Sequence, residues 1–302
     1  MRHQMPMKYV DAVAKAGSIR KAAETLSITS TALNRRILAM EEDLGVALFE
    51  RVPQGVRLTA AGEIMIHHIR NQLSEMERVK SQIADLIGER RGHVSIACSQ
   101  ALLPFFLPEQ ISRYRREHKA VTFDVFVRDR AAAEQALIDR SADLALVFEP
   151  VRMAEFHTLL TILQPVHVIM PAGHPLAGLE KVRLRDCLQF PLALPTAPYG
   201  VRHLLELAVR RTSLELKAAI QSDSFEFLRN YTHDDEMLAF QLPIGLPPEE
   251  EGAEMVHRPL DERDVAPGYL YFGQLQNRIL PVAAARFAMQ MQETFVSRFE
   301  CE

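Results

Sequence analysis

The feature that most constrains the fold is a pair of short helical segments near the N-terminus, residues 19–26 and 29–44, separated by a tight turn. Ser18 and Thr29 precede the two segments, and both residue types are favoured helix N-caps. The second segment carries an apolar stripe at helical spacing, formed by Leu33, Ile37, Met40 and Leu44. Such a stripe has to face a core, so the two segments are predicted to pack as a helical hairpin.

The opposite face of the second segment is polar and carries Ser30, Thr31, Asn34 and Arg35. Arginine can bind guanine through two hydrogen bonds, and asparagine can bind adenine in the same way. Two helices joined by a short turn, with this face on the second, predict a helix-turn-helix whose second helix enters the major groove of DNA. The alternative is an ordinary solvated face on a three-helix bundle.

The segment that follows predicts a β-hairpin wing and then a long helix. Residues 51–58 form two short arms around a turn that contains proline and glycine. Arg51 and Arg57 lie in these arms, where a wing would meet the phosphates of DNA. Phosphate contacts hold a protein in register on the duplex without reading its sequence. Thr59 caps a helix to about Gly88, with an apolar seam at Ile66, Ile69, Leu73, Met76, Val79, Ile83 and Leu86 or Ile87. The seam predicts pairing with a second subunit, and a homodimer would present two reading helices to a two-fold operator.

The charge of the chain is divided unevenly. Residues 1–91 hold 14 lysines and arginines and 11 acidic residues, a net charge of +3, whereas the remainder carries −7. This asymmetry indicates a polyanionic partner, such as double-stranded DNA, for the N-terminal part.

Composition and motifs exclude several classes of protein. No apolar run is long enough to span a bilayer, and no export signal precedes the first helix, so we expect a cytoplasmic protein without membrane contact. Cys98, Cys187 and Cys301 lie far apart, which argues against disulfides and a zinc site. The nucleophile elbow, the P-loop, the dinucleotide fingerprint and the zinc-protease motif are all absent from the sequence. We therefore expect no catalytic residues, no metal and no cofactor.

From residue 92 onward, short apolar strands alternate with amphipathic helices, which predicts parallel sheets covered by helices. The predicted strands are 93–99, 121–127, 144–148, 166–171, 192–195, 217–221, 238–242 and 270–273, and the predicted helices are 103–117, 131–140, 199–211, 225–231 and 282–298. Two α/β units fit this order, joined near residues 165 and 265.

The N-terminal motifs resemble the LysR-type transcriptional regulators. They are the runs AVA, GSI, KAA, ALNR, LGV, LFER and GVRLT, in this order between Ala12 and Gly62. The chain departs from the family at the start of the second helix, where Thr29, Ser30 and Thr31 replace a common serine, glutamine and proline or small residue. Asn34 also replaces a usual serine. These departures leave the operator sequence open.

The resemblance continues through Leu103-Pro104, Asp143-Leu144-Ala145-Leu146 and His174-Pro175-Leu176. It implies an α/β protein with an N-terminal winged helix-turn-helix, a long linker helix and a C-terminal two-lobed effector domain resembling periplasmic binding proteins. The implied boundaries are 1–59 for the DNA-binding domain, 60–91 for the linker and dimerisation helix, and 92–302 for the effector domain. Lobe I comprises 92–165 and 267–302, and lobe II comprises 166–266. The implied function is sequence-specific transcription regulation by a homodimer or homotetramer, with RNA polymerase as a further candidate partner.

Ligands of open α/β sheets bind beyond the carboxyl ends of the strands. The residues expected there are Ser99, Gln100 and Ala101 after the first strand, Arg128 after the second, Thr196 after the fifth and Ser222 after the sixth. Ser99 and Gln100 precede a predicted helix, whose free N–H groups favour an anion. The sequence therefore predicts a small organic acid as the effector. One departure bears on this site, because Asp234-Asp235-Glu236-Met237 stands where the family usually has a glycine-rich turn.

Three alternatives stay open at this stage. The first is a regulator of the same fold that switches through oxidation of Cys98, at the end of the first strand. The second is an enzyme, since α/β lobes host many chemistries. The third is an architectural DNA-binding protein, which would not need some two hundred residues of α/β sensor.

Overall fold

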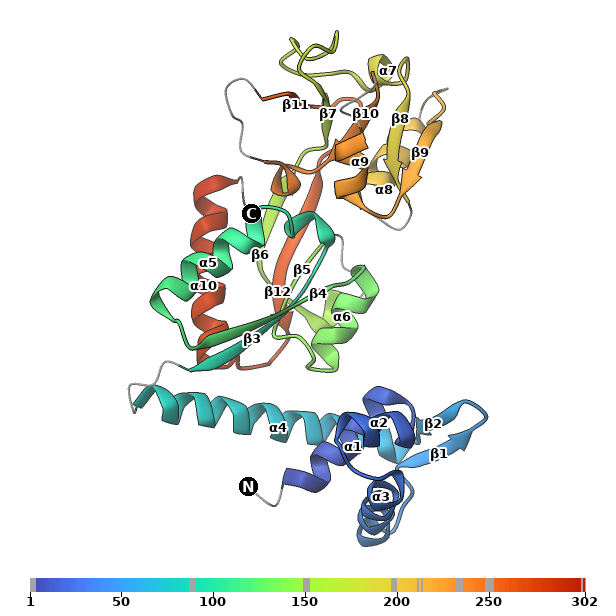
Figure 1. The fold of residues 1–302 in the computed structure, drawn as a ribbon, viewed down its shortest axis with the longest axis vertical. Coiled ribbons are helices and arrows are strands. Elements are labelled where there is room, and N and C mark those ends of the chain that lie inside the picture. Colours follow the sequence, from blue (N-terminus) through green and yellow to red (C-terminus); the bar gives the residue numbers. More distant parts are fainter. Residues whose placement is uncertain are drawn as a thin grey trace. The chain divides into compact units, whose positions relative to one another are not determined.

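The computed structural model describes residues 4–86, 91–148, 153–196, 200–210, 212, 214–231, 236–247, 253–299 and 301. The chain divides into two compact units, Met1–Ile87 and Gly88–Glu302 (Figure 1). Over the described ranges, no helix has both the length and the apolar character required to cross a membrane. Each unit has its own hydrophobic core.

The first unit consists of helices and one two-stranded hairpin. Its elements are α1 (Met5–Ala16), α2 (Ile19–Thr25), α3 (Ser30–Leu44), β1 (Phe49–Val52), β2 (Gly55–Leu58) and α4 (Ala60–Leu86). The hydroxyl of Ser18 accepts from the backbone N–H of Lys21, and that of Thr29 accepts from Ala32, so both N-caps form as predicted. The unit is a winged helix-turn-helix followed by a long helix.

The core of the first unit is built on the apolar sides of α1, α2 and α3. Val13, Leu33 and Ile37 are buried in it. Leu44 was predicted in the same stripe, and that prediction is wrong, because its side chain is 45% exposed. Leu44 is the last residue of α3, and Gly45 ends the helix in the left-handed conformation. The last turn of α3 therefore lies at the edge of the core rather than in it.

The first part of α4 belongs to this core. Ile66 and Ile69 are buried in it, and Leu73 packs against it. The Arg70 guanidinium binds Asp11 of α1 at 3.0 Å, which holds α4 along α1. The predicted seam therefore does not serve a second subunit along its whole length, because its N-terminal half is used within the same chain. Ile83, further along, is 51% exposed.

The second unit contains two five-stranded sheets. The lobe I sheet has the order β4-β3-β5-β12-β6. Its elements are β3 (Gly92–Cys98), η2 (Gln100–Leu102), α5 (Phe106–Glu117), β4 (Val121–Val127), α6 (Arg130–Ile138), β5 (Leu144–Phe148), η3 (Met153–Glu155), β6 (Phe156–Gln164), β12 (Gly268–Leu275) and α10 (Val282–Arg298). Side chains of α5 and α10 pack on one face of this sheet, and those of α6 pack on the other.

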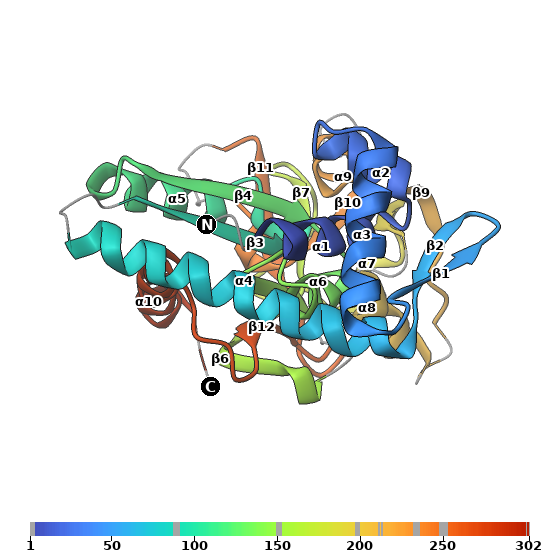
Figure 2. The same cartoon turned by 90° about the horizontal axis from the view of Figure 1, so that it is seen from below.

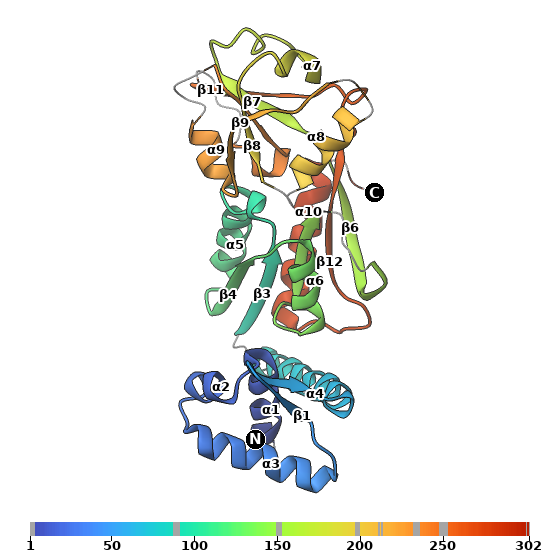
Figure 3. The same ribbon diagram turned by 90° about the vertical axis from the view of Figure 1, so that its right-hand side faces the viewer.

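The lobe II sheet has the order β11-β7-β10-β8-β9. Its elements are β7 (His167–Pro171), α7 (Leu184–Cys187), β8 (Leu192–Pro195), α8 (Gly200–Arg210), β9 (Ala218–Ser222), α9 (Phe225–Tyr231), β10 (Leu238–Gln241), η4 (Pro243–Gly245) and β11 (Met255–Pro259). Side chains of α8 and α9 pack on opposite faces of this sheet (Figure 3). The chain passes between the sheets twice, from β6 to β7 and from β11 to β12.

The sheets are mixed, so the prediction of parallel sheets is wrong in part. Strands β3, β4 and β5 pair in parallel, as do β8, β9 and β10. Strand β12 returns from lobe II and pairs antiparallel with both β5 and β6, and β7 pairs antiparallel with β10 and β11. The sequence reading missed β6 and β11, because both contain half-buried positions rather than a continuous buried apolar run.

A buried ion pair joins β3, β5 and the segment after β12. The Arg278 guanidinium donates to Asp143 at 2.5 Å and to the carbonyl of Ala142 at 2.8 Å. The other oxygen of Asp143 accepts from the backbone N–H and the hydroxyl of Ser95, at 2.9 and 2.8 Å. The two charged side chains are only 8% and 5% exposed. Asp143, part of the family motif, therefore connects three segments that are distant in sequence.

Replacing Asp143 by asparagine should lower the free energy of unfolding of the second unit by about 3–5 kcal/mol, because Arg278 would stay buried without a charged partner. Chemical denaturation followed by circular dichroism measures the loss. The exposed pair Glu109–Arg298 is the matched control, with side chains 48% and 44% exposed. Arg298→Gln should change stability by about 0–1 kcal/mol. Equal losses in the two variants would contradict a special role for Asp143.

Candidate nucleic-acid interface and ligand cleft

The predicted reading face of α3 lies on the outside of the first unit. Ser30, Thr31 and Arg35 are exposed and Asn34 is half-buried, whereas Leu33 on the other side is fully buried. The amphipathic pattern therefore places these four polar side chains together on one accessible face, as the sequence predicted.

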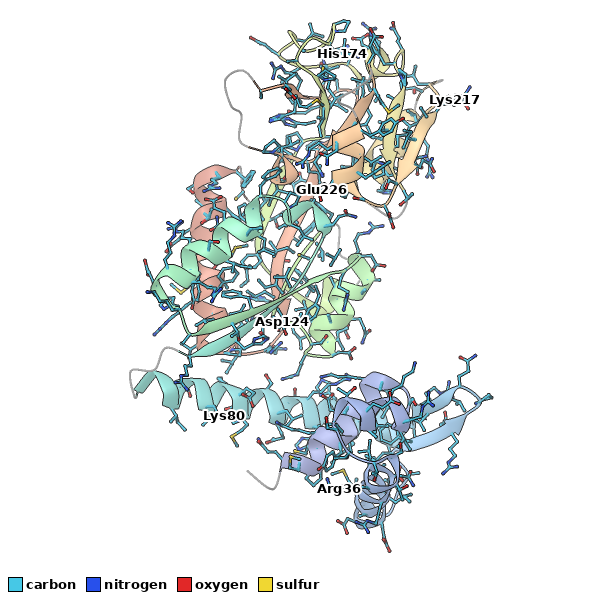
Figure 4. The ribbon with its side chains drawn as sticks, viewed as in Figure 1. Arg36, Lys80, Asp124, His174, Lys217 and Glu226 are labelled. Carbon is cyan, nitrogen blue, oxygen red and sulfur yellow. The ribbon has the colours of Figure 1, made fainter. Side chains whose placement is uncertain are left out.

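Arg36 follows Arg35 in sequence but has a structural role. Its guanidinium lies 4.6 Å from the centre of the Tyr9 ring and also donates to the Tyr9 hydroxyl (Figure 4). This contact between α3 and α1 fixes the helix that carries the reading face. Of the two adjacent arginines, Arg35 is the one that faces away from the core.

A groove separates the start of α3 from the hairpin, which projects from the helices of the unit (Figure 2). The groove has a volume of about 640 Å³ and is lined by Ser18, Ile19, Arg20, Ser30, Thr31, Asn34, Arg51, Val52, Pro53, Gly55 and Val56. Three of the predicted reading residues thus lie in the same surface as Arg51. Arg20 was not predicted, because it lies at the start of the first helix of the pair, away from the polar face of the second.

A backbone contact attaches the hairpin to the α1–α2 turn. The Val56 N–H donates to the carbonyl oxygen of Gly17 at 2.9 Å. Gly55 has a φ of +146°, and a Cβ built on it would lie 2.1 Å from the same oxygen. Only glycine permits so close an approach at this backbone angle. The hairpin backbone is therefore held close against the α1–α2 turn at one end of the groove.

The structure separates the two predicted wing arginines. In the β1–β2 register Glu50 lies opposite Arg57 and Arg51 lies opposite Val56. Since neighbours in a strand point to opposite faces, Arg51 and Arg57 are on different faces of the hairpin. Arg57 donates to Glu50 from Nε at 2.8 Å and from Nη2 at 2.6 Å. Arg51 faces the groove, whereas Arg57 is paired with a carboxylate outside it.

The second predicted site lies between the lobes. Ser99 and Arg128 come together in a small cavity, with Asp129, Arg130, Val147, Phe148 and Gly200 as the other lining residues. Gly200 brings the start of α8 close to lobe I, because a Cβ there would lie 3.2 Å from that of Phe148. The cavity measures about 20 Å³, which is room for roughly one water molecule. Pockets for metabolites are usually about 300–1,000 Å³, so this cavity, as the described residues bound it, is too small for a metabolite.

The remaining predicted effector residues are not part of this cavity. Ala101 is buried among apolar side chains of the core. Thr196 and Ser222 lie side by side in lobe II, where the Thr196 N–H donates to the Ser222 carbonyl at 3.0 Å. The Ser222 hydroxyl accepts from the Ser224 N–H at 3.1 Å. The family departure at Asp234 and Asp235 lies outside the described residues.

Gln100 connects the two lobes. Its side-chain amide donates to the Asp223 carbonyl, and its side-chain oxygen accepts from the Phe225 N–H at 3.1 Å. A second contact between the lobes lies beside it, where the Arg229 guanidinium of α9 is 5.1 Å from the centre of the Phe105 ring. We call the two hydrogen bonds of Gln100 the interlobe clasp. Gln100 was predicted to bind an effector; in the structure its side chain bonds lobe II through one amide N–H and the amide oxygen.

Cys98 does not have the surroundings of a redox sensor. Its side chain is fully buried in the lobe I core. Burial raises the pKa of the Cys98 thiol to about 12, so the thiol stays protonated at neutral pH. Reactive cysteines are accessible and have a lowered pKa. The geometry therefore favours a structural role for Cys98 over the redox alternative.

Comparison with known proteins identifies the family. Residues 6–63 match the model of the bacterial regulatory helix-turn-helix protein, lysR family, and residues 88–296 match that of the LysR substrate binding domain. The chain belongs to the LysR family. The second match alone covers more than half of the chain, and the two matches fall on the first and second compact units respectively.

Known LysR-family relatives cover most of the chain. A probable nitrogen assimilation transcriptional activator of Synechococcus elongatus is 26% identical over 254 residues, which are 83% of this chain and 82% of that protein. The regulator CbbR of Sinorhizobium medicae is 30% identical over 211 residues, 70% of this chain and 67% of that protein. Full-length OxyR from Pseudomonas aeruginosa has the same fold, with a TM-score of 0.70 at 18% identity over 96% of this chain and 97% of that one.

Removing the interlobe clasp should expose one identifiable amide. In Gln100→Ala the Phe225 N–H loses its hydrogen bond to the Gln100 side chain, and its hydrogen exchange should become about 2- to 10-fold faster, the equivalent of one ordinary hydrogen bond. Residue-resolved hydrogen exchange measures this rate. The Leu228 N–H donates within α9 to Ser224 at 3.1 Å and is the internal control, which should not change. An unchanged rate at Phe225 would show that the clasp does not form.

Proposed function

We propose that this LysR-type regulator binds a two-fold operator in double-stranded DNA and changes its DNA complex when a small organic acid enters the cleft between its lobes. The observation that carries the DNA-binding part is the groove of the first unit. It brings the exposed reading face of α3 and Arg51 of the hairpin into one surface. A reading helix and an arm that binds phosphate must keep a constant separation to hold register on a duplex.

The residues of this surface divide by chemistry. Ser30, Thr31, Asn34 and Arg35 present hydrogen-bonding groups from a helix, the element that fits the major groove. Arg51 faces the groove beside them and binds the phosphate backbone. Arg57 contributes less than Arg51, because it has to leave Glu50 before it can bind a phosphate. These roles match the two kinds of contact that a sequence-specific binder needs.

Substitutions at Arg35 and Arg51 should have different signatures. Arg35→Ala should cost about 1–3 kcal/mol on duplexes with the preferred base and little on others. Arg51→Ala should weaken binding uniformly and reduce the dependence on salt by about one phosphate contact per protomer. Fluorescence anisotropy on duplexes selected by the wild-type protein from a random library measures both. Uniform loss in Arg35→Ala would make that residue a phosphate contact, and a wild type that ignores every duplex at low salt would overturn the proposal.

The effector part rests on the cavity between the lobes. Ser99 supplies a hydroxyl, and Arg128 supplies a cation at the end of the neighbouring strand. The Arg128 guanidinium lies 5.3 Å from the centre of the Phe126 ring and donates to the Val127 carbonyl at 3.0 Å, which positions it at the cavity. A hydroxyl and a guanidinium are suited to a carboxylate. Because the cavity is too small for a metabolite, binding requires the lobes to move.

Arg128→Gln should therefore weaken carboxylate binding at least tenfold, since a charge-assisted contact is lost. Calorimetric titration with a panel of mono- and dicarboxylic metabolites identifies the ligand on the wild type and then compares the variants. Arg115→Gln is the matched control, because Arg115 is an exposed arginine of α5 outside the cavity. Equal affinity in wild type and Arg128→Gln would remove this residue from the site.

The proposed assembly is a homodimer through α4, and two dimers form a tetramer. The C-terminal half of α4 is the part available for pairing, because Ile66 and Ile69 are already buried within the chain. Movement of the lobes changes the geometry of this assembly and with it the spacing of the DNA-binding units, a shift between existing states. RNA polymerase is the further partner through which such a change acts on transcription.

A further inference from the structure

Arg20, the second residue of α2, opens onto the groove beside α3. Ser18, Ile19 and Arg20 form the wall of the groove that faces the hairpin. The side chain of Arg20 is 80% exposed. The groove thus has an arginine on each of its two walls, Arg20 on α2 and Arg51 on β1.

The guanidinium of Arg20 is available to an external partner. Its ion pair with Glu24 is long, at 3.8 Å, and both side chains are largely exposed, so solvent screens the attraction. Among the described residues that line the groove, two are arginines and none is acidic. A groove with this positive charge, and with polar side chains of α3 in its lining, is complementary to a polyanionic strand.

We propose that Arg20 and Arg51 hold one phosphodiester strand from two sides while the start of α3 faces the bases. The inference rests on the proposed DNA binding and adds Arg20 as a further positioning residue. The two walls cannot move apart freely, because the Gly17 carbonyl accepts from Val56 beside Gly55. The strand therefore meets two cations that extend from backbone segments joined by this hydrogen bond. Such contacts fix register and carry no base preference.

Binding of the full-length protein to a mixed-sequence duplex and to a wild-type-selected duplex, measured over a series of salt concentrations, tests this. Arg20→Ala should weaken binding several-fold on both duplexes to the same extent. It should also reduce the slope of log affinity against log salt by about 0.9 per protomer, the value for one phosphate contact. Arg20→Lys keeps the charge and should restore most of the slope.

Lys21→Ala is the matched control, because Lys21 is an exposed cation on the same helix that does not line the groove. It should leave affinity and slope unchanged. The losses of Arg20→Ala and Arg51→Ala should combine in the double variant, with a slope reduced by two contacts. A wild-type slope in Arg20→Ala, or an equal effect of Lys21→Ala, would overturn the proposal for Arg20. Absence of salt-dependent binding by the wild type would instead overturn the DNA-binding function itself.

Discussion

The contact between the hairpin and the α1–α2 turn is the constraint on which the DNA-facing surface depends. It joins backbone to backbone, with the Val56 N–H on the Gly17 carbonyl and no room for a Cβ at Gly55. Side chains can change rotamer, whereas a hydrogen-bonded backbone contact cannot yield without breaking. The contact therefore sets where the hairpin backbone lies against the α1–α2 turn, and the fold in this way places the backbone of Arg51 across the groove from that of Arg20.

In the second unit, the contacts that matter are those within each lobe and those between the two lobes. Each lobe has a sheet with buried helices on its faces, and Asp143 and Arg278 stabilise the interior of lobe I. Between the lobes, in contrast, the side-chain contacts beside the cleft are local, with the interlobe clasp of Gln100 and the stacking of Arg229 on Phe105. The apolar core also continues from one lobe into the other, so a ligand that rearranges the lobes has to offset this packing as well as the clasp.

Local patterns in the sequence predicted the parts that depend on periodicity and capping. The helix-turn-helix, the hairpin and the outward face of α3 follow from apolar spacing, N-caps and a proline-glycine turn. Strand pairing was harder, because β6 and β11 lack a distinctive pattern and β12 returns from a distant part of the chain. The pairing register of β1 and β2 places Arg57 opposite Glu50, away from the groove. No local signal relates Gln100 to Phe225, 125 residues later, so its use as a clasp required the folded chain.

The energy of the interlobe clasp is consistent with a switch driven by a metabolite. Two hydrogen bonds contribute about 0.5–1.5 kcal/mol each, and the half-buried cation–ring contact adds about 0.5–2 kcal/mol. The total is about 1.5–5 kcal/mol, which a ligand offsets when its concentration L exceeds its dissociation constant roughly 10- to 5,000-fold, because it stabilises the state it binds by RT ln(1 + L/Kd). A much stronger connection would keep the cleft closed at metabolite concentrations, and a much weaker one would leave it open without ligand. The polar contacts between the lobes are thus weak enough for a tightly bound small acid at the Ser99 and Arg128 cavity to offset them.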